Sequence, residues 1–264
     1  MSLPPIGLWR DRTETMPSGA TILSVWAHPD DEAFVAAGAL AGAASRGCRV
    51  VSVYATLGEH GWQGTPSRRP LDLGGVRSRE LVDALAALGV DEWHCLNYPD
   101  GGLTGVPFAT GVARVLALLE DVQPDRVITF GPDGFTGHPD HMTVSAWVTA
   151  AARRWDRSDT TVRHTAITDE WASRYAPALG EFNAFWPGYP VATPSELARS
   201  WRLDERLLDR KVAALRAHRS QTAHLFATLG ESFMRAMAAT EWFRAPAAAA
   251  SRMEMTCGAL VPQP

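Results

Sequence analysis

The sequence has few cysteines and no long apolar segment. Its 264 residues include three cysteines, Cys48, Cys95 and Cys257, which lie far apart in the chain. An odd, widely spaced set disfavours a disulfide framework or a Cys-type zinc site and is typical of buried apolar thiols. No segment supplies the roughly 18 uninterrupted apolar residues that a membrane span needs, so we expect no membrane partner.

Excess charge of one sign is also lacking. The formal net charge is −4, with acidic and basic residues mixed along the chain. A nucleic-acid or anionic-membrane partner would call for a basic surface, so we expect neither. The first 17 residues contain prolines and charges but no apolar core of a secretory signal, which predicts a cytoplasmic protein. Nothing in the sequence indicates the oligomeric state.

What the chain does contain is an alternation of apolar runs and helical patterns. The predicted strands are 21–27, 49–56, 93–96, 126–130 and 160–168, and the predicted helices are 32–45, 76–88, 107–122, 141–154 and 204–218. This alternation predicts an α/β fold, a Rossmann-like, mostly parallel sheet with helices on both faces. Residues 171–194 combine prolines and aromatics, which favours an irregular segment near a substrate entrance. We expect one domain over 21–244, an N-terminal extension over 1–20 and a peripheral tail over 245–264.

The first cluster of chemical interest is His28-Pro29-Asp30-Asp31-Glu32, at the end of the first predicted strand. Ligands of open α/β sheets bind at the carboxyl ends of strands, so position and chemistry agree. One such aspartate could simply cap the following helix. An imidazole and three carboxylates in one turn are more than a cap requires.

A second cluster, His138-Pro139-Asp140-His141, follows the predicted strand 126–130. Alone, its two histidines could be surface residues at the start of a helix. Together, the two clusters contain what a water-activating metal site needs: a few His and carboxylate ligands, a further carboxylate as general base, and a histidine that an aspartate can hold. Composition gives this set but does not sort Asp30 from Asp31, or His138 from His141.

The motifs 27–32 and 137–141, at these places in an α/β pattern, resemble the LmbE/PIG-L family of zinc-dependent N-deacetylases, which release acetate from N-acetylglucosaminyl compounds. The resemblance implies the metal ligands His28, Asp31 and His141. It also implies that Asp30 is the general base and that His138, with Asp140, is an electrostatic and acid group. The implied metal is Zn²⁺, although two nitrogens and a carboxylate would also hold Fe²⁺ or Co²⁺.

Further matches extend the resemblance over about residues 21–243. They imply contacts to sugar hydroxyls by Glu59, Arg77 and Asp100, whereas the residues alone equally allow Arg77 to pair with Glu80 or Asp83 on a helix surface and Asp100 to be a turn residue. Lys211 and the stretch 218–221 match the family's C-terminal helix signature, and His218 could line the pocket or face the core. One departure is Thr136, where some members that act on thiol precursors carry a tyrosine near the oxyanion.

These observations predict a metal-dependent hydrolase that removes the N-acetyl group from an N-acetylglucosamine-containing small molecule. An amidase that cleaves a larger acyl group, such as a thiol conjugate, from an amino sugar is the nearest alternative. A metal- or sugar-binding protein without turnover would not need both Asp30 and Asp31. A dinucleotide-binding oxidoreductase is disfavoured because no G-x-G-x-x-G follows the first predicted strand.

Overall fold

The computed structural model describes residues 18–63, 69–155, 157, 159–182, 184–186, 191–197 and 199–246. In this part of the chain the strands form a sheet in the order β3-β2-β1-β4-β5-β7-β6. They are β1 (Thr21–Trp26), β2 (Arg49–Tyr54), β3 (Glu92–Cys95), β4 (Arg126–Phe130), β5 (Thr161–Thr165), β6 (Arg199–Arg202) and β7 (Thr240–Arg244). The strands from β3 to β5 are parallel, and β7 runs antiparallel to β5 and β6. The predicted mostly parallel sheet is confirmed.

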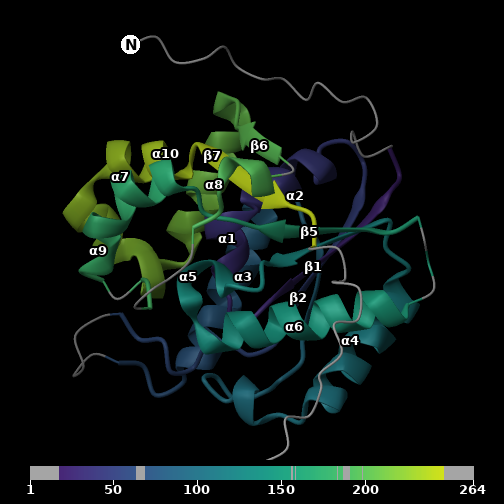
Figure 1. Cartoon of the computed structure of the whole chain (residues 1–264). Helices are drawn as coiled ribbons and strands as arrows, with labels where there is room; N and C mark the ends of the chain where they lie inside the picture. Colours follow the sequence, from purple (N-terminus) through teal and green to yellow (C-terminus); the bar gives the residue numbers. More distant parts are fainter. Residues whose placement is uncertain are drawn as a thin grey trace, which may run out of the picture.

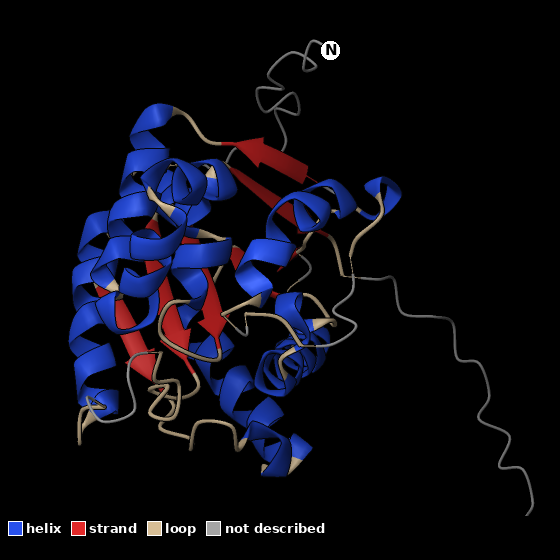
Figure 2. Ribbon diagram, turned by 90° about the vertical axis from the view of Figure 1, so that its left-hand side faces the viewer, coloured by secondary structure: helices blue, strands red, loops and turns tan. Residues whose placement is uncertain are grey.

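Helices pack on both faces of this sheet (Figure 1, Figure 2). Their bounds are α1 (Asp31–Val35), α2 (Ala37–Ala44), α3 (Leu73–Leu88), α4 (Phe108–Val122), α5 (Gly134–Gly137), α6 (Pro139–Arg154), α7 (Asp169–Gly180), α8 (Glu205–Ala217), α9 (Arg219–Leu229) and α10 (Glu231–Ala238). The helices α2, α3 and α8 pack together in one layer, and α4 packs against α6 in the other. None of the described helices is long and apolar enough to cross a membrane.

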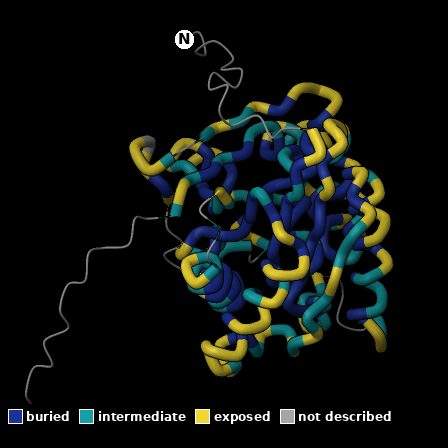
Figure 3. The backbone as a smooth tube through the Cα atoms, turned by 90° about the vertical axis from the view of Figure 1, so that its right-hand side faces the viewer, coloured by how far each residue is buried: buried dark blue, intermediate teal, exposed yellow. Residues whose placement is uncertain are grey.

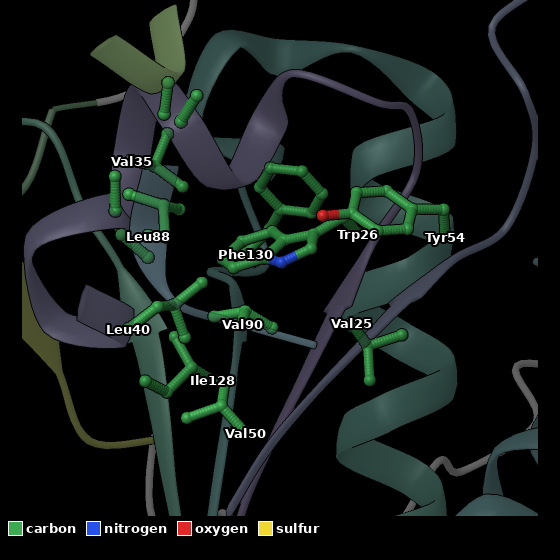
Figure 4. Close-up of a cluster of buried hydrophobic side chains, with 14 of the residues drawn as sticks. Val25, Trp26, Val35, Leu40, Val50, Tyr54, Leu88, Val90, Ile128 and Phe130 are labelled. Carbon is green, nitrogen blue, oxygen red and sulfur yellow. The ribbon is translucent and has the colours of Figure 1, made fainter. Parts of the chain in front are cut away.

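The core is the central part of the sheet together with the helices on it. Burial runs along β1, β2 and β4 almost without interruption, as expected for strands covered on both faces (Figure 3). At the carboxyl ends of β1 and β4, Trp26 meets Phe130 edge to face, with ring centroids 5.2 Å apart (Figure 4). The residues that follow these two strands therefore start from a rigid platform.

The predicted helix 32–45 is two helices, because the chain breaks at Ala36 with φ −145°. The first free N–H groups of α2, on Gly38 and Ala39, donate to the carboxylate of Glu241 on β7 at 2.7 and 3.0 Å. Lys211 on α8 pairs with the same buried carboxylate at 2.8 Å. A distant acidic side chain thus satisfies a helix start that the local sequence leaves uncapped.

The structure corrects the expectation that 171–194 is irregular throughout. Residues 169–180 form α7, whose first turn is capped by the hydroxyl of Thr168, and Pro177 lies inside the helix. The strands β6 and β7 were also not predicted, because four- and five-residue antiparallel strands leave too little period-2 pattern. The proposed extension 1–20 and tail 245–264 lie mostly outside the described residues.

Candidate metal centre and active site

The two motifs meet where β1 and β4 end, as the topology requires for neighbouring parallel strands. Nδ1 of His28 lies 3.2 Å from Nε2 of His141, which in turn lies 3.3 Å from Oδ1 of Asp31. One donor atom from each of these three buried residues falls within 4.8 Å of the others. Two imidazoles and a carboxylate therefore face one point.

Hydrogen bonds fix which ring nitrogens face that point. Nδ1 of His141 lies 2.9 Å from the carbonyl oxygen of Gly134, and a carbonyl can only accept, so Nδ1 carries the proton and Nε2 presents its lone pair. Nε2 of His28 lies 3.0 Å from a carboxylate oxygen of Asp100 and 3.3 Å from one of Asp140, so it also donates. This leaves Nδ1 of His28 facing His141 and Asp31. Histidine ligands of metals are oriented by such outer contacts.

The local electrostatics favour a positive charge at this point. Burial by itself lowers the pKa of His28, but the hydrogen bonds that its ring donates to Asp100 and Asp140 and the charge of Asp31 raise this pKa to about 10. Burial, with the neighbouring His28, lowers the pKa of His141 to about 3, so this ring is neutral at physiological pH. A divalent cation fits the donor set, because it satisfies two inward-facing nitrogens and a carboxylate together.

The carboxylate of Asp140 supports His28, which corrects the expectation that it holds His138. It accepts the N–H groups of Gly101 at 2.8 Å and Leu103 at 3.2 Å, and it contacts Nε2 of His28. The N-cap of α6 is His138, and Asp140 lies in the first turn of that helix. Asp140 thus ties the loop after β3 to a candidate metal ligand.

His138 is held through its own helix. Its Nδ1 accepts the backbone N–H of Asp140 at 3.1 Å, so the proton of the neutral ring is on Nε2. Burial, with the nearby His141 and His28, lowers the pKa of His138 to about 4. Its ring lies 4.9 Å from that of His28, and it lines the same cavity. The side chain is therefore a neutral N–H donor beside the metal ligands.

Asp30 has a backbone conformation that is rare for a residue with a side chain, with φ 112°. Its N–H donates to Oε2 of Glu32 at 3.2 Å, and its carboxylate lies 3.2 Å from Nη2 of Arg77. Burial raises the pKa of Asp30 to about 6, against the attraction of Arg77. At neutral pH the group is an ionised carboxylate with a proton affinity suited to general-base chemistry. Strain of this kind is often found at functional sites.

Arg77 acts mainly within the protein. It is 3% exposed, and its guanidinium donates to the carbonyl oxygens of Gly58 and Pro29 besides contacting Asp30. It does not pair with Glu80, whose carboxylate accepts from Ser220. Arg77 therefore anchors the loop after β2 to the first motif and fixes the carboxylate of Asp30.

Asp100 and Glu59 continue a chain of hydrogen bonds that starts at His28. Burial alone raises the pKa of Asp100, but its hydrogen bond to His28 holds that pKa well below the usual range. The same carboxylate accepts the N–H of His60 at 2.9 Å, and the N–H of Asp100 donates to Glu59 at 2.9 Å. Asp100 lines the cavity of the metal ligands, whereas Glu59 lines a neighbouring hollow beside Leu57. Contact of Glu59 with a sugar stays a prediction.

Glu32 and His218 form a fully buried pair that the sequence reasoning left undecided. Nε2 of His218, between α8 and α9, lies 2.8 Å from Oε1 of Glu32, and both side chains have no exposed surface. Burial alone lowers the pKa of His218, but the charge of Glu32 raises it above its ordinary value. Since Glu32 also accepts the N–H of Asp30, the pair links the C-terminal helices to the general-base candidate. His218 is thus a core residue, and only its distant partner explains it.

The metal ligands open into a cavity of about 390 Å³. Its polar lining, which we call the polar side, includes Asp30, Arg77, Asp100 and His60. Its apolar lining, which we call the apolar side, comes from α1, β4, α5, α7, the segment 182–186, α9, α10 and β7. Thr136 lines the cavity, and its hydroxyl lies 3.4 Å from Nδ1 of His141.

The chain belongs to the family described as PIG-L, GlcNAc-PI de-N-acetylase, whose model matches residues 23–152. It is 33% identical over 211 residues to the 1D-myo-inositol 2-acetamido-2-deoxy-alpha-D-glucopyranoside deacetylase of Rhodococcus erythropolis, covering 71% of this chain and 70% of the relative. The protein of the same name from Acidothermus cellulolyticus is 34% identical over 235 residues, covering 77% and 80%.

Comparison of structures agrees on the fold. The N,N'-diacetylchitobiose deacetylase from Pyrococcus horikoshii superposes with a TM-score of 0.61 at 20% sequence identity, covering 85% of this chain and 82% of that one. The predicted α/β fold is confirmed. His218, which lies beyond the residues matched by the family model, still reaches the first motif through Glu32.

Proposed function

We propose that this protein is a metal-dependent deacetylase that hydrolyses the N-acetyl group of an N-acetylglucosamine-containing small molecule. The relatives named above support the reaction and the amino-sugar substrate. The observation that carries the proposal is the convergence of His28, Asp31 and His141 beside the carboxylate of Asp30. The proposed metal is Zn²⁺, which suits two imidazoles and one carboxylate with a further position left for water or substrate.

In this proposal His28, Asp31 and His141 hold the cation. A cation held there supplies Lewis acidity to the amide carbonyl and lowers the pKa of water. Asp30, fixed by Arg77, takes a proton from the attacking water as the new C–O bond forms. The Nε2–H of His138 stabilises the charge that develops on the carbonyl oxygen. Asp30 then returns its proton to the nitrogen, the C–N bond breaks, and acetate and the free amine leave.

The variant Asp30→Asn tests this assignment. It keeps the shape of the side chain and its contact to Arg77 but cannot accept a proton, so we expect kcat to fall by about 10²- to 10⁴-fold with the metal content unchanged. Acetate release from N-acetylglucosaminides and metal analysis measure the two effects. Asp209→Asn is the matched control, since Asp209 pairs with Arg235 at the surface of α8 and should keep full activity. Near-normal turnover of Asp30→Asn with metal bound would rule out the general-base role.

A further inference from the structure

We propose that the apolar side of the cavity is a subsite for an apolar aglycone, an aryl or alkyl group attached to the amino sugar. This inference rests on the proposed function, because it assigns the space beside the scissile amide to the rest of the same substrate. The cavity of about 390 Å³ is larger than an acetyl group needs and within the range of small-molecule sites. The question is therefore what chemistry the remaining space accepts.

The apolar side is built from aromatic side chains that come from several separate elements. They are Phe135, Trp171, Phe182, Phe185, Trp186 and Trp242, and we call this set the aromatic wall. Trp171 lies 6.3 Å from Phe135 and 6.2 Å from Phe185 between ring centroids. Phe135, Trp171 and Phe185 are thus connected by ring contacts, and an aromatic lining of this kind favours burial of apolar groups.

The aromatic wall begins directly at the reacting groups. The backbone N–H of Trp186 donates to the carbonyl oxygen of Thr136 at 2.9 Å, and its ring meets that of His138 edge to face at 5.5 Å. Trp186 is nevertheless 47% exposed, although a large aromatic side chain is usually more buried. A partly exposed tryptophan fixed beside His138 offers uncovered apolar surface where a bound substrate would extend beyond its amide.

Polar side chains that line the cavity near the aromatic wall are partly used within the protein. Glu241 lines the cavity but is paired with Lys211 and with the N–H groups at the start of α2, and the side-chain amide of Gln221 donates to Ser220. His224 lies 5.1 Å from Phe182 between ring centroids. Hydroxyl groups that lose water against aromatic rings without a new partner bind unfavourably. An aryl or alkyl group loses nothing of this kind and gains from burial. The chemistry of the apolar side therefore favours an apolar aglycone over the inositol in the names of the relatives.

The experiment compares the phenyl, octyl and myo-inositol glycosides of N-acetylglucosamine, each in both anomeric forms, with the metal-loaded protein. For each aglycone we compare the anomer with the higher kcat/KM. We expect the phenyl or the octyl glycoside to exceed the inositol glycoside in kcat/KM by about tenfold or more. Trp186→Ala and Phe185→Ala should lower kcat/KM for the apolar glycosides by about tenfold, mainly through KM, and leave the inositol glycoside within about twofold. Phe108→Ala is the matched control, since Phe108 is exposed on α4. This variant should leave kcat/KM unchanged for all three glycosides.

Preference for the inositol glycoside, or equal losses on all glycosides in the wall variants, would overturn the subsite. Faster cleavage of N-octanoylglucosamine than of any N-acetyl glycoside would also overturn it, because the wall would then serve the acyl chain. Calorimetric binding of octyl glucosaminide, the expected product, separates the two proposals. If octyl glucosaminide binds, if Trp186→Ala weakens that binding, and if no glycoside is turned over, the subsite is supported and the proposed deacetylase function is refuted. Turnover of the glycosides with no preference among the aglycones supports the deacetylase function and refutes the subsite.

Discussion

The two sides of the cavity are built in different ways. The metal ligands and Asp30 come from two short stretches, 28–31 and 138–141, and their side chains are fixed by buried hydrogen bonds. The aromatic wall comes from elements spread over residues 135–242, and ring contacts join three of its members, Phe135, Trp171 and Phe185. The residues that we assign to the reaction thus lie close together in the sequence and are fixed by hydrogen bonds. The residues that we assign to substrate choice are spread along the sequence, so substitutions can change them more easily.

The largest expected effect comes from removing a metal ligand. His141→Ala deletes a lone pair at the point where the two motifs meet, and the ring of Phe130 that stacks on His141 at 4.2 Å loses its partner. We expect loss of metal binding and at least about a 10³-fold loss of acetate release, since the Lewis acid is lost. Metal titration and turnover measure this. Full activity of metal-free His141→Ala protein would show that the polar side does not work through a cation.

The next effect concerns the support of Asp30. His218→Ala leaves Glu32 as an unpaired buried charge, so we expect the free energy of unfolding to fall by about 3–5 kcal/mol. Urea unfolding measures this, and the double variant with Glu32→Gln should recover part of the loss, because the pair is coupled. Arg49→Ala, which breaks the exposed pair with Glu92, is the control and should cost at most about 1 kcal/mol. A loss at His218 no greater than at Arg49 would contradict a stabilising pair.

The same pair predicts a pH dependence. The folded-state pKa of His218 is raised above its unfolded value of about 6.5 by Glu32, so its contribution to stability is complete below that value. The contribution is lost as the pH rises through the folded-state pKa. Between neutral and alkaline pH, the free energy of unfolding should therefore fall less in His218→Ala than in the unsubstituted protein. Parallel plots of this free energy against pH for the two proteins would argue against the pairing.

The smallest effect is expected on the aromatic wall. Trp171→Phe keeps an aromatic ring, smaller than the indole, but loses the hydrogen bond from Nε1 to the carbonyl oxygen of Met237. We expect the free energy of unfolding to fall by about 1–3 kcal/mol, with metal content unchanged and kcat for N-acetylglucosamine within about threefold. Loss of metal in this variant would erase the distinction between the two sides of the cavity.

Much of the site could be predicted because each motif is local. His28 and Asp31 lie three residues apart after a buried strand, and His138 and His141 follow another, so their residue types and positions are visible without the fold. The hydrogen bonds of Asp140 to His28 and of Glu32 to His218 could not be predicted, because they join residues 112 and 186 positions apart. The same holds for the carboxylate of Glu241 at the start of α2.

By itself the sequence determined the α/β alternation, the parallel strands that carry the two motifs, and the set of candidate metal-binding and proton-accepting groups. These features follow from periodicity and from side-chain chemistry within a few residues. Only the tertiary structure decided the division of work among them: Asp140 and Asp100 orient His28, Arg77 and Glu32 fix Asp30, and the aromatic wall forms opposite. The physical reason is that buried polar groups must find partners, and the fold alone decides which distant groups come within hydrogen-bonding distance.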